Sequence, residues 1–339
     1  MTKLQEYIIH NLSMLFLSIF SALFTIVSVV FFIKLATYTA VIQLSIFDMI
    51  KLYLFVMPEL LFFTLPLTFF ISAALTIFRL SNDNEIIVLF SLGIHPKFIL
   101  RTLLTPALLL STLLLFNFFF LFPHAKVLSK NFITYKKSEA KFNLSASEYG
   151  HKFGEWLVFL GEKNTDETFS NVYLFNKKST QEILIEASTA EIINDSGILR
   201  LKLTDGEGYT YSKEKFTQID FKEMIINDTF ASKLIEYRSA LDYWTSDERK
   251  KKKVATFISN TLMSLFPLLS LFLILSISIV HARHQKNKIY LYIFLGIVVY
   301  FSASLWLQKA LSFYAIPAII VVWSIGTYYI YKKTVVARF

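Results

Sequence analysis

Six long apolar stretches, separated by polar segments, dominate the hydrophobic pattern of the chain. Each holds roughly 20 or more residues with few charges, the length at which an α-helix crosses a hydrocarbon core of about 30 Å. They are Leu12–Leu35, Leu52–Phe78, Phe98–Phe122, Val254–Val280, Ile289–Leu307 and Phe313–Tyr331. The first is too long for the hydrophobic region of a signal peptide and lacks a small-residue cleavage site. The pattern predicts an α-helical membrane protein with six transmembrane helices.

The polar segment between the third and fourth stretches shows the alternation of β-strands instead. Leu199, Leu201 and Leu203 alternate with polar residues, which is the period of a half-buried strand. Asp205-Gly206 follows them and predicts a tight hairpin turn. Further strands are predicted at Glu155–Gly161, Val172–Phe175, Glu182–Ile193 and Phe216–Ile226. Several short strands separated by turns favour a β-sandwich, a jelly roll or an open barrel.

Both ends of this polar segment are predicted to be helical. Four lysines that follow the third stretch share one helical face, so we expect that helix to continue out of the membrane. They are Lys126, Lys130, Lys137 and Lys141. Asp242–Lys253 is expected to return to the membrane as a polar helix. The chain is therefore divided into residues 1–122 with three spans, residues 123–253 with the all-β domain, and residues 254–339 with three more spans.

Composition assigns these parts to two different solvents. Hydrophobic residues make up 55% of the chain and charged residues only 17%, whereas soluble domains carry about 25% charged residues. Residues 123–253 contain 21 of the 34 Lys and Arg residues and 20 of the 25 Asp and Glu residues. The polar segment is therefore expected in water and the apolar stretches in lipid.

Basic residues in the short loops predict the orientation, because Lys and Arg are enriched in cytoplasmic loops. Ten lie on one side: Lys3, Arg79, Lys97, Arg101, Arg283, Lys286, Lys288, Lys332, Lys333 and Arg338. Three lie on the other side: Lys34, Lys51 and Lys309. The bias predicts cytoplasmic termini and an outer location for residues 123–253. The basic run Arg249–Lys253 opposes this prediction, but long translocated domains largely escape the rule.

No pattern in the chain predicts covalent catalysis. The chain has no cysteine, which excludes a disulfide framework, a cysteine-based zinc site and a thiol nucleophile. None of its nine glycines belongs to a G-x-x-x-x-G-K-[ST] phosphate loop, and neither H-E-x-x-H nor G-x-S-x-G occurs. We therefore expect a transport or scaffold protein without catalytic residues, rather than an enzyme.

The loop between the second and third stretches predicts a short cytoplasmic helix near residues 82–93. Asn82 as N-cap and Glu85 three residues later form a capping-box pattern, and Gly93 suits the C′ position, with Pro96 beyond it. Its apolar residues are Ile86, Ile87, Leu89 and Phe90. In one interpretation Glu85 caps the helix and the apolar residues rest on the bilayer. In the other, this is a coupling helix seated in a groove of a cytoplasmic ATPase, and Glu85 reaches that partner.

This loop resembles that of the lipopolysaccharide export permeases of the LptF/LptG type. The matching residues are Leu65-Pro66, Arg79-Leu80-Ser81, Asp83, Glu85, Leu89 and Gly93-Ile94. The plan of three spans, a β-rich insert and three spans is similar to the family's over essentially the whole chain. Leu92 departs from the small residue usual in the family, so we expect the coupling helix to pack differently at this position. The stretch from Arg79 to Glu85 is slightly more like LptF.

The resemblance implies a half-transporter of the bacterial inner membrane. Two such permeases would pair with a dimer of a separate ABC ATPase and enclose a cavity open to the outer leaflet. ATP and Mg²⁺ would bind to that ATPase, and this chain would bind no cofactor, metal or nucleic acid. The periplasmic domain would be a jelly roll that passes lipopolysaccharide to a jelly-roll bridge protein. The residues implied for ATPase coupling are Asp83, Glu85, Ile86, Leu89, Phe90 and Gly93.

Lysines near the outer membrane surface, with Arg249–Lys253 and the lysine face at 126–141, are predicted to form a basic ring. The cargo that the resemblance implies carries phosphates on its lipid A, and selected lysines of the ring would bind them as point charges. These lysines are Lys34, Lys51, Lys309, Lys126 and Lys130. The alternative is that each lysine only snorkels from the end of a span to water or phospholipid phosphate. Lys34 is the preferred cargo contact, because the first span lines the lateral opening in the family.

Glu59 is the only acidic residue well inside a predicted span, so we expect it to face protein or water. It either pairs with a cavity lysine such as Lys34, or caps the break at Pro58 or bonds across a helix interface. Two functions remain in view. The first is a permease subunit of an ATP-driven lipopolysaccharide extractor, and the alternative is a non-transport scaffold or sensor whose outer β-domain binds a protein.

Overall fold

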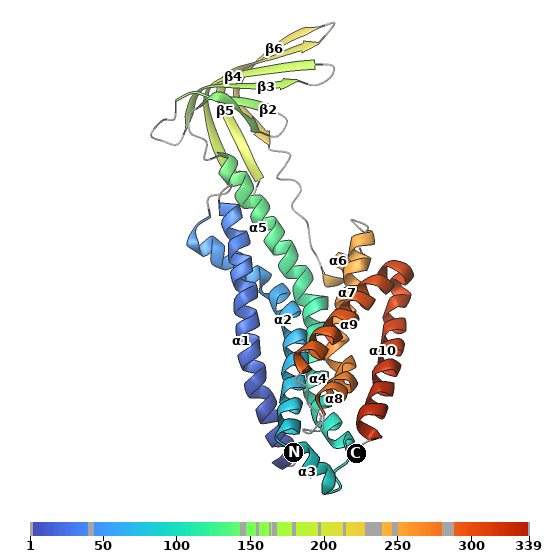
Figure 1. Ribbon diagram of the computed structural model, residues 1–339. Helices are drawn as coiled ribbons and strands as arrows, with labels where there is room; N and C mark the ends of the chain where they lie inside the picture. Colours follow the sequence, from blue (N-terminus) through green and yellow to red (C-terminus); the bar gives the residue numbers. More distant parts are fainter. Residues whose placement is uncertain are drawn as a thin grey trace. The chain divides into compact units, whose positions relative to one another are not determined.

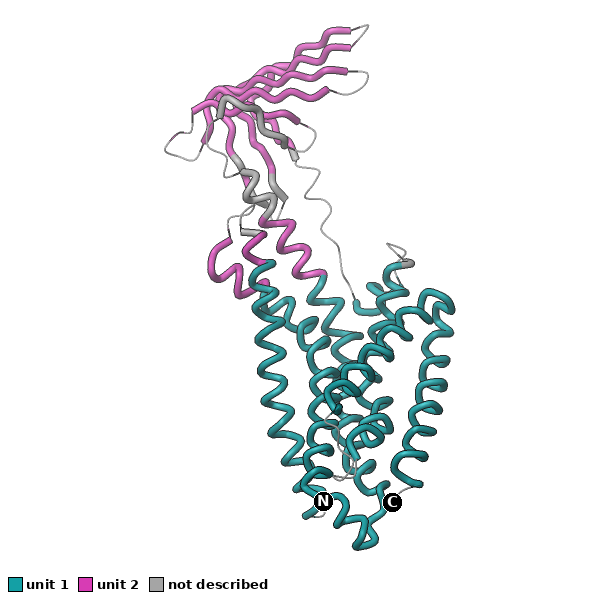
Figure 2. The backbone as a smooth tube through the Cα atoms, in the orientation of Figure 1, with its two compact units in different colours: residues 1–34, 53–126, 237–339 teal, residues 35–52, 127–236 magenta. Residues whose placement is uncertain are grey.

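The computed structural model divides the chain into two compact units (Figures 1 and 2). Unit 1 comprises Met1–Lys34, Tyr53–Lys126 and Tyr237–Phe339, and unit 2 comprises Leu35–Leu52 and Val127–Glu236. The structure describes residues 3–39, 44–142, 147–153, 156–162, 164, 168–177, 181–195, 198–212, 215–227, 239–245, 250–279 and 288–337. Several residues of the predicted loops, among them Arg249, Arg283, Lys286 and Arg338, lie outside these ranges.

The described residues of all six apolar stretches are helical, except for a turn at Ser270 and extended backbone at Ile279, both in the fourth stretch. The long helices are α1 (Lys3–Thr39), α2 (Ile46–Asn82), α4 (Lys97–Phe116), α5 (Phe122–Phe142), α7 (Lys250–Leu269), α8 (Leu271–Ser278), α9 (Ile289–Leu311) and α10 (Ala315–Tyr331). The short helices are α3 (Glu85–Ser91) and α6 (Ala240–Thr245). The π-helical turn η1 (Asn117–Leu121) joins α4 to α5 without a break, so the third helix does continue beyond the apolar stretch, as predicted.

By length and composition, four helical stretches among the described residues are able to cross a membrane, and a fifth is added if the bent pair α7 and α8 is one span. The bend is 46° and lies at Ser270, three residues after Pro267. One of the four stretches, Ile289–Val336, contains both α9 and α10. The predicted number of six is therefore not confirmed by this measure.

The chain nevertheless reverses direction inside Ile289–Val336. Ser312 has φ 51° and ψ −126°, outside the helical region, and the short 3₁₀ turn η4 (Ser312–Tyr314) follows. The rings of Tyr300 and Trp323 are 4.9 Å apart, although 23 residues of one straight helix would separate them by about 35 Å. Helices α9 and α10 are thus two antiparallel helices that lie side by side (Figure 1).

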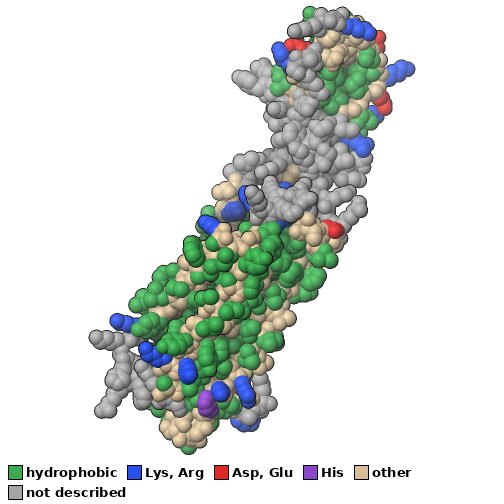
Figure 3. Space-filling view, turned by 90° about the vertical axis from the view of Figure 1, so that its right-hand side faces the viewer, with side chains coloured by type: hydrophobic (Ala, Val, Ile, Leu, Met, Phe, Trp, Pro, Cys, Tyr) green, Lys and Arg blue, Asp and Glu red, His purple; other side chains and the backbone are tan. Residues whose placement is uncertain are grey.

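An aromatic core holds the helices of unit 1 together. Phe266 of α7 contacts Phe70 of α2 at 5.2 Å and Tyr300 of α9 at 4.6 Å, measured between ring centroids. A Cβ atom on Gly296 would lie 3.0 Å from Leu273 and 3.1 Å from Phe70, so glycine permits the close approach of α9 to α8 and α2. On the face shown in Figure 3, the surface of these helices is largely hydrophobic, and Lys and Arg side chains lie toward its ends.

Helix α1 is the exception, because most of its apolar length is exposed. Only 6% of its most apolar window is buried, and Leu17, Ile26 and Ile33 are each about 60% exposed. The C-terminal half of α1 is attached to α2 where Tyr53 stacks on Phe32. An exposed apolar helix of this kind is suited to contact lipid or another membrane-embedded chain.

Six antiparallel strands form the sheet of unit 2. They are β1 (Ser147–Phe153), β2 (Trp156–Leu160), β3 (Phe169–Lys177), β4 (Gln181–Asp195), β5 (Ile198–Ser212) and β6 (Phe216–Asn227). Each strand pairs with the next one along the chain, so the order is β1-β2-β3-β4-β5-β6 (Figure 1). A jelly roll consists of two sheets with Greek-key connections. The described strands form one sequential sheet, and the predicted jelly roll is not confirmed.

The predicted hairpin at Asp205-Gly206 is wrong, because both residues lie inside the continuous strand β5. A Cβ atom on Gly206 would lie 2.2 Å from the carbonyl oxygen of Glu186 and 2.5 Å from the ring of Phe221. Glycine is therefore needed there for the close approach of neighbouring strands, which is a common reason for glycine within a strand.

The two faces of the sheet differ. One face holds a core that includes Val172, Leu174 and Leu203, all fully buried. The opposite face carries a cross-strand row of Leu157, Phe175, Leu184 and Tyr209, which pair in register across β2 to β5. Leu157 and Leu184 are exposed in this row, so unit 2 presents apolar side chains on the face away from its core.

Candidate functional site

Helix α3 begins differently from the prediction. Asn82 is the last residue of α2, and Asn84 is the N-cap of α3, with φ 63° in the left-handed region and no hydrogen bond from its side chain. The capping box of Asn82 and Glu85 is therefore wrong. An N-cap residue needs a non-helical backbone, and the backbone of Asn82 is still part of α2.

The end of α3 agrees with the prediction for Gly93. Gly93 has φ 85°, and its N–H donates to the carbonyl of Phe90 at 3.0 Å. The N–H of Ile94 donates to the carbonyl of Leu89 at 3.1 Å. These two bonds form a Schellman motif with Gly93 at C′. The motif fixes the direction in which the chain leaves α3 toward α4.

The apolar residues of α3 divide into an inner and an outer face. Ile86 is 1% exposed and belongs to the helical core of unit 1, and Phe90 packs against the same core. Val88 and Leu92 point outward, with 54% and 74% of their surface exposed. Ile86 thus anchors α3 to its own chain, and the residues available to a partner include two that the sequence analysis did not select. Val88 and Leu92 are four residues apart, which places both on one helical face, and this spacing is the sequence signal that could have identified them.

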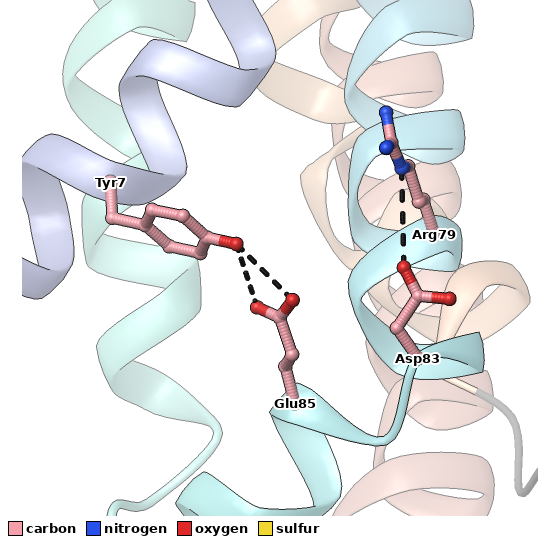
Figure 4. Close-up of polar contacts among 4 residues, drawn as sticks. All are labelled: Tyr7, Arg79, Asp83 and Glu85. Atoms are coloured by element: carbon pink, nitrogen blue, oxygen red, sulfur yellow. Dashed lines mark hydrogen bonds and ion pairs between the residues drawn. The ribbon is translucent and has the colours of Figure 1, made fainter.

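Glu85 forms a hydrogen bond with α1. The hydroxyl of Tyr7 lies 3.0 Å from Oε2 and 3.2 Å from Oε1 of Glu85, and it donates its proton to this carboxylate (Figure 4). Nearby, Arg79 Nε lies 3.9 Å from Asp83 Oδ2, and both side chains are largely exposed. Sequence reasoning missed Tyr7, because 78 residues separate it from Glu85.

A cavity of about 300 Å³ lies between the first turns of α1 and helix α3. Its lining includes Leu4, Tyr7 and Ile8 from α1, and Glu85, Val88 and Leu89 from α3. The lining is mostly apolar and contains the Glu85 carboxylate. This arrangement is suited to hold an apolar side chain beside an acidic group.

The structure places all five predicted phosphate-binding lysines on the surface. Lys34, Lys126 and Lys309 belong to unit 1, and Lys51 and Lys130 belong to unit 2. Each of the five is exposed, and the ammonium of Lys126 lies 4.9 Å from the centre of the Phe122 ring. The basic ring, which takes residues from both units, stays a prediction.

Glu59 lies half-buried in α2, and within the described part of the chain it has no hydrogen bond or ion pair with Lys34 or any other residue. Its neighbour Pro58 instead receives a contact from η1, where Asn117 Nδ2 donates to the Pro58 carbonyl at 3.0 Å. Asn117 is buried and was not selected from the sequence. The bond across the helix interface is made by Asn117 rather than by Glu59.

Unit 2 contains a second polar cluster that sequence reasoning missed. Asp48 N–H donates to Ser45 Oγ at 3.2 Å, and Ser45 N–H donates to Asp48 Oδ2 at 3.1 Å. These reciprocal bonds are a capping box at the start of α2. The same Asp48 oxygen lies 3.1 Å from Lys136 Nζ of α5, and both side chains are largely buried, at 12% and 16% exposed. The cluster joins α5 to the first turn of α2.

Comparison with known families gives a match over most of the chain. The family model described as lipopolysaccharide export system permease LptF/LptG matches residues 6–330, which is nearly the whole chain. No curated protein matches the chain. The match includes both units and helix α3.

Proposed function

This chain belongs to the LptF/LptG family of lipopolysaccharide export permeases, and we propose that it is one half of an ATP-driven extractor of that lipid. Family membership makes it a multi-pass membrane transport protein rather than an enzyme. The proposed complex contains a second permease of the family and a cytoplasmic ABC ATPase dimer. That dimer binds the ATP and Mg²⁺, and a periplasmic jelly-roll bridge protein receives the lipid.

We place six spans in the bilayer, with both termini in the cytoplasm and unit 2 mainly in the periplasm. The reversal at Ser312 supports counting α9 and α10 as two spans. The bent pair α7 and α8 then counts as one span, as does α4 with η1 and the start of α5. The charge bias of the short loops supports the orientation.

Helix α3 is the observation that carries the proposal. It is a short helix on a loop between two spans, held by buried Ile86 and by the Schellman motif at Gly93. Its outer face presents Val88 and Leu92, and Glu85 lines the adjacent cavity. A small helix that is fixed to the spans on one face and exposed on the other is suited to transmit a partner's movement into the membrane part.

The cargo path is proposed to run from the spans to the sheet. Exposed lysines such as Lys34 would hold the lipid A phosphates as point charges. The exposed apolar row of Leu157 and Leu184 supports contact of the sheet with acyl chains. The scaffold alternative is not favoured, because the matching family consists of transport permeases.

Affinity purification in mild detergent tests the proposal, with the co-eluting ATPase and lipopolysaccharide as readouts. We expect Glu85→Ala to weaken recovery of the ATPase. Glu6→Ala is the matched control. Glu6 is an exposed carboxylate in the first turn of α1, and its ion pair is with Lys3. We expect Lys34→Asp to lower photocrosslinking to lipopolysaccharide, with Lys288→Asp as control. Wild-type levels of ATPase and crosslinked lipid in both test variants would refute the proposal.

A further inference from the structure

Helix α1 is attached to the rest of unit 1 mainly near its ends. Ile8 and Leu12 near its start are buried, whereas Leu17 and Ile26 are exposed. In the C-terminal half, Ser28 and Tyr53 of α2 share a hydrogen bond of 3.0 Å. At the start of α1, the hydroxyl of Tyr7 is bound to Glu85. Most of the helix therefore lacks the packing that would make it follow its neighbours.

The contact between Tyr7 and Glu85 joins this helix to α3 directly. A phenol hydroxyl has a single proton to donate, and a carboxylate has about four acceptor positions. The two distances of 3.0 and 3.2 Å place the hydroxyl between both oxygens of Glu85, so the carboxylate keeps acceptor positions for a further donor. Glu85 is also the residue directly before buried Ile86, so α3 cannot shift without moving this carboxylate.

We propose that Tyr7 is a positioning residue that links α1 to α3, so that displacement of α3 moves the start of α1. The inference rests on the proposed function. Tyr7 holds Glu85 at the edge of the cavity and does not contact the cargo. Since α1 has few other attachments along its apolar length, we expect this hydrogen bond, together with the packing of Leu4 and Ile8 beside α3, to carry a movement of α3 to α1.

The first test replaces Tyr7 by Phe, which removes the hydroxyl and keeps the ring in the cavity wall. The complex purified with this chain is reconstituted into vesicles containing lipopolysaccharide, and ATP hydrolysis and lipid release are both measured. We expect unchanged assembly and about a threefold increase in ATP hydrolysed per lipid released, which is at the low end of the effect of losing one hydrogen bond, because this bond is exposed to water. Tyr290→Phe, at an exposed tyrosine at the start of α9, should leave the ratio unchanged.

A second test restores the link by another route. The chain has no cysteine, so Leu4→Cys and Val88→Cys introduce a single pair of thiols from α1 and α3, both lining the cavity. In the Tyr7→Phe background, we expect a short bismaleimide to return the ratio toward the wild-type value. N-ethylmaleimide, which cannot bridge the two thiols, should not restore it. If the hydroxyl had only a structural role, this covalent bridge would not restore the ratio.

Three outcomes would overturn the inference. They are a wild-type ratio in Tyr7→Phe, loss of assembly in that variant, and a bridge that stops lipid release in the presence of Tyr7, since the last means that the contact must open. Failure of the proposed function looks different, because the wild-type chain itself would then recover neither an ATPase nor lipopolysaccharide.

Discussion

Two places in the chain carry the same sequence pattern and use it differently. Ser45 and Asp48 precede and begin α2, and Asn82 and Glu85 have the same three-residue spacing before and within α3. At the first place both reciprocal bonds of a capping box are present, and the carboxylate also holds Lys136. At the second place neither bond forms, and the carboxylate binds Tyr7 instead.

The difference follows from what comes before each pattern. Ser45 is preceded by a non-helical residue, so its backbone is free to adopt the extended conformation of an N-cap. Asn82 continues α2, and the chain then turns through Asp83 and the left-handed Asn84. The Asp48 carboxylate accepts a hydrogen bond at the start of its own helix. The Glu85 carboxylate makes no such bond, so it is able to bind a residue of a distant helix. The pattern predicts a helix start, but it does not predict the partner of its carboxylate.

The largest effect is expected from breaking the first cluster. Asp48→Ala removes the carboxylate half of the capping box and the ion pair with Lys136, so we expect α2 and α5 to lose about 2 kcal/mol of local stability. Hydrogen exchange of the amides at the start of α2 and in α5 measures this loss. Asp242→Ala, which removes an exposed carboxylate from the first turn of α6, is the control. Equal exchange in the two variants would contradict the role of the cluster.

A smaller effect separates the two patterns themselves. Ser45→Ala removes one capping acceptor. We expect the free energy of opening of the Asp48 amide to fall by about 1 kcal/mol. Asn82→Ala should change the opening of the Glu85 amide by less than about 0.3 kcal/mol, because the Asn82 side chain caps nothing. Equal effects of the two substitutions would show that both segments are capping boxes in solution.

The smallest effect is expected at the exposed ion pair. Arg79→Ala removes the contact with Asp83 at 3.9 Å, and exposed pairs of this kind contribute at most about 0.5 kcal/mol. Thermal unfolding in detergent should show no resolvable shift, whereas Lys136→Ala should shift the midpoint downward. A larger shift for Arg79→Ala than for Lys136→Ala would show that the ion pair beside α3 contributes more to stability than the pair of Asp48 and Lys136.

The helices were predictable from the sequence because the membrane imposes one strong condition. A segment that crosses lipid must satisfy its backbone internally and stay apolar for about 20 residues, so its pattern is long and uniform. The sequence pattern of a strand is shorter and less regular than that of a membrane-spanning helix, so it predicts the element less well. Ser147–Phe153 was not predicted, since it lacks a regular apolar alternation and pairs irregularly with β2. The other five strands alternate well enough to be found, as at Leu201 and Leu203.

The contacts of the candidate site were less predictable, because they join residues far apart in the chain. Gly93 was found from local chemistry alone, since only the backbone at a helix end decides its conformation. Tyr7 with Glu85, and Asn117 with Pro58, are 78 and 59 residues apart, and no spacing rule relates them. Such pairs depend on the crossing of helices, which is decided by packing across the whole unit.

The buried hydroxyl of Tyr300 has a consequence for sliding motions. It donates to the Leu262 carbonyl at 2.6 Å, and nearer the other end of α9 Gln308 is hydrogen bonded to Ser259 of the same helix, α7. Tyr300 is fully buried, so water cannot replace its bond, and axial displacement of α9 along α7 would leave this hydroxyl without an acceptor. The contact at Tyr300 therefore opposes sliding of α9 along α7.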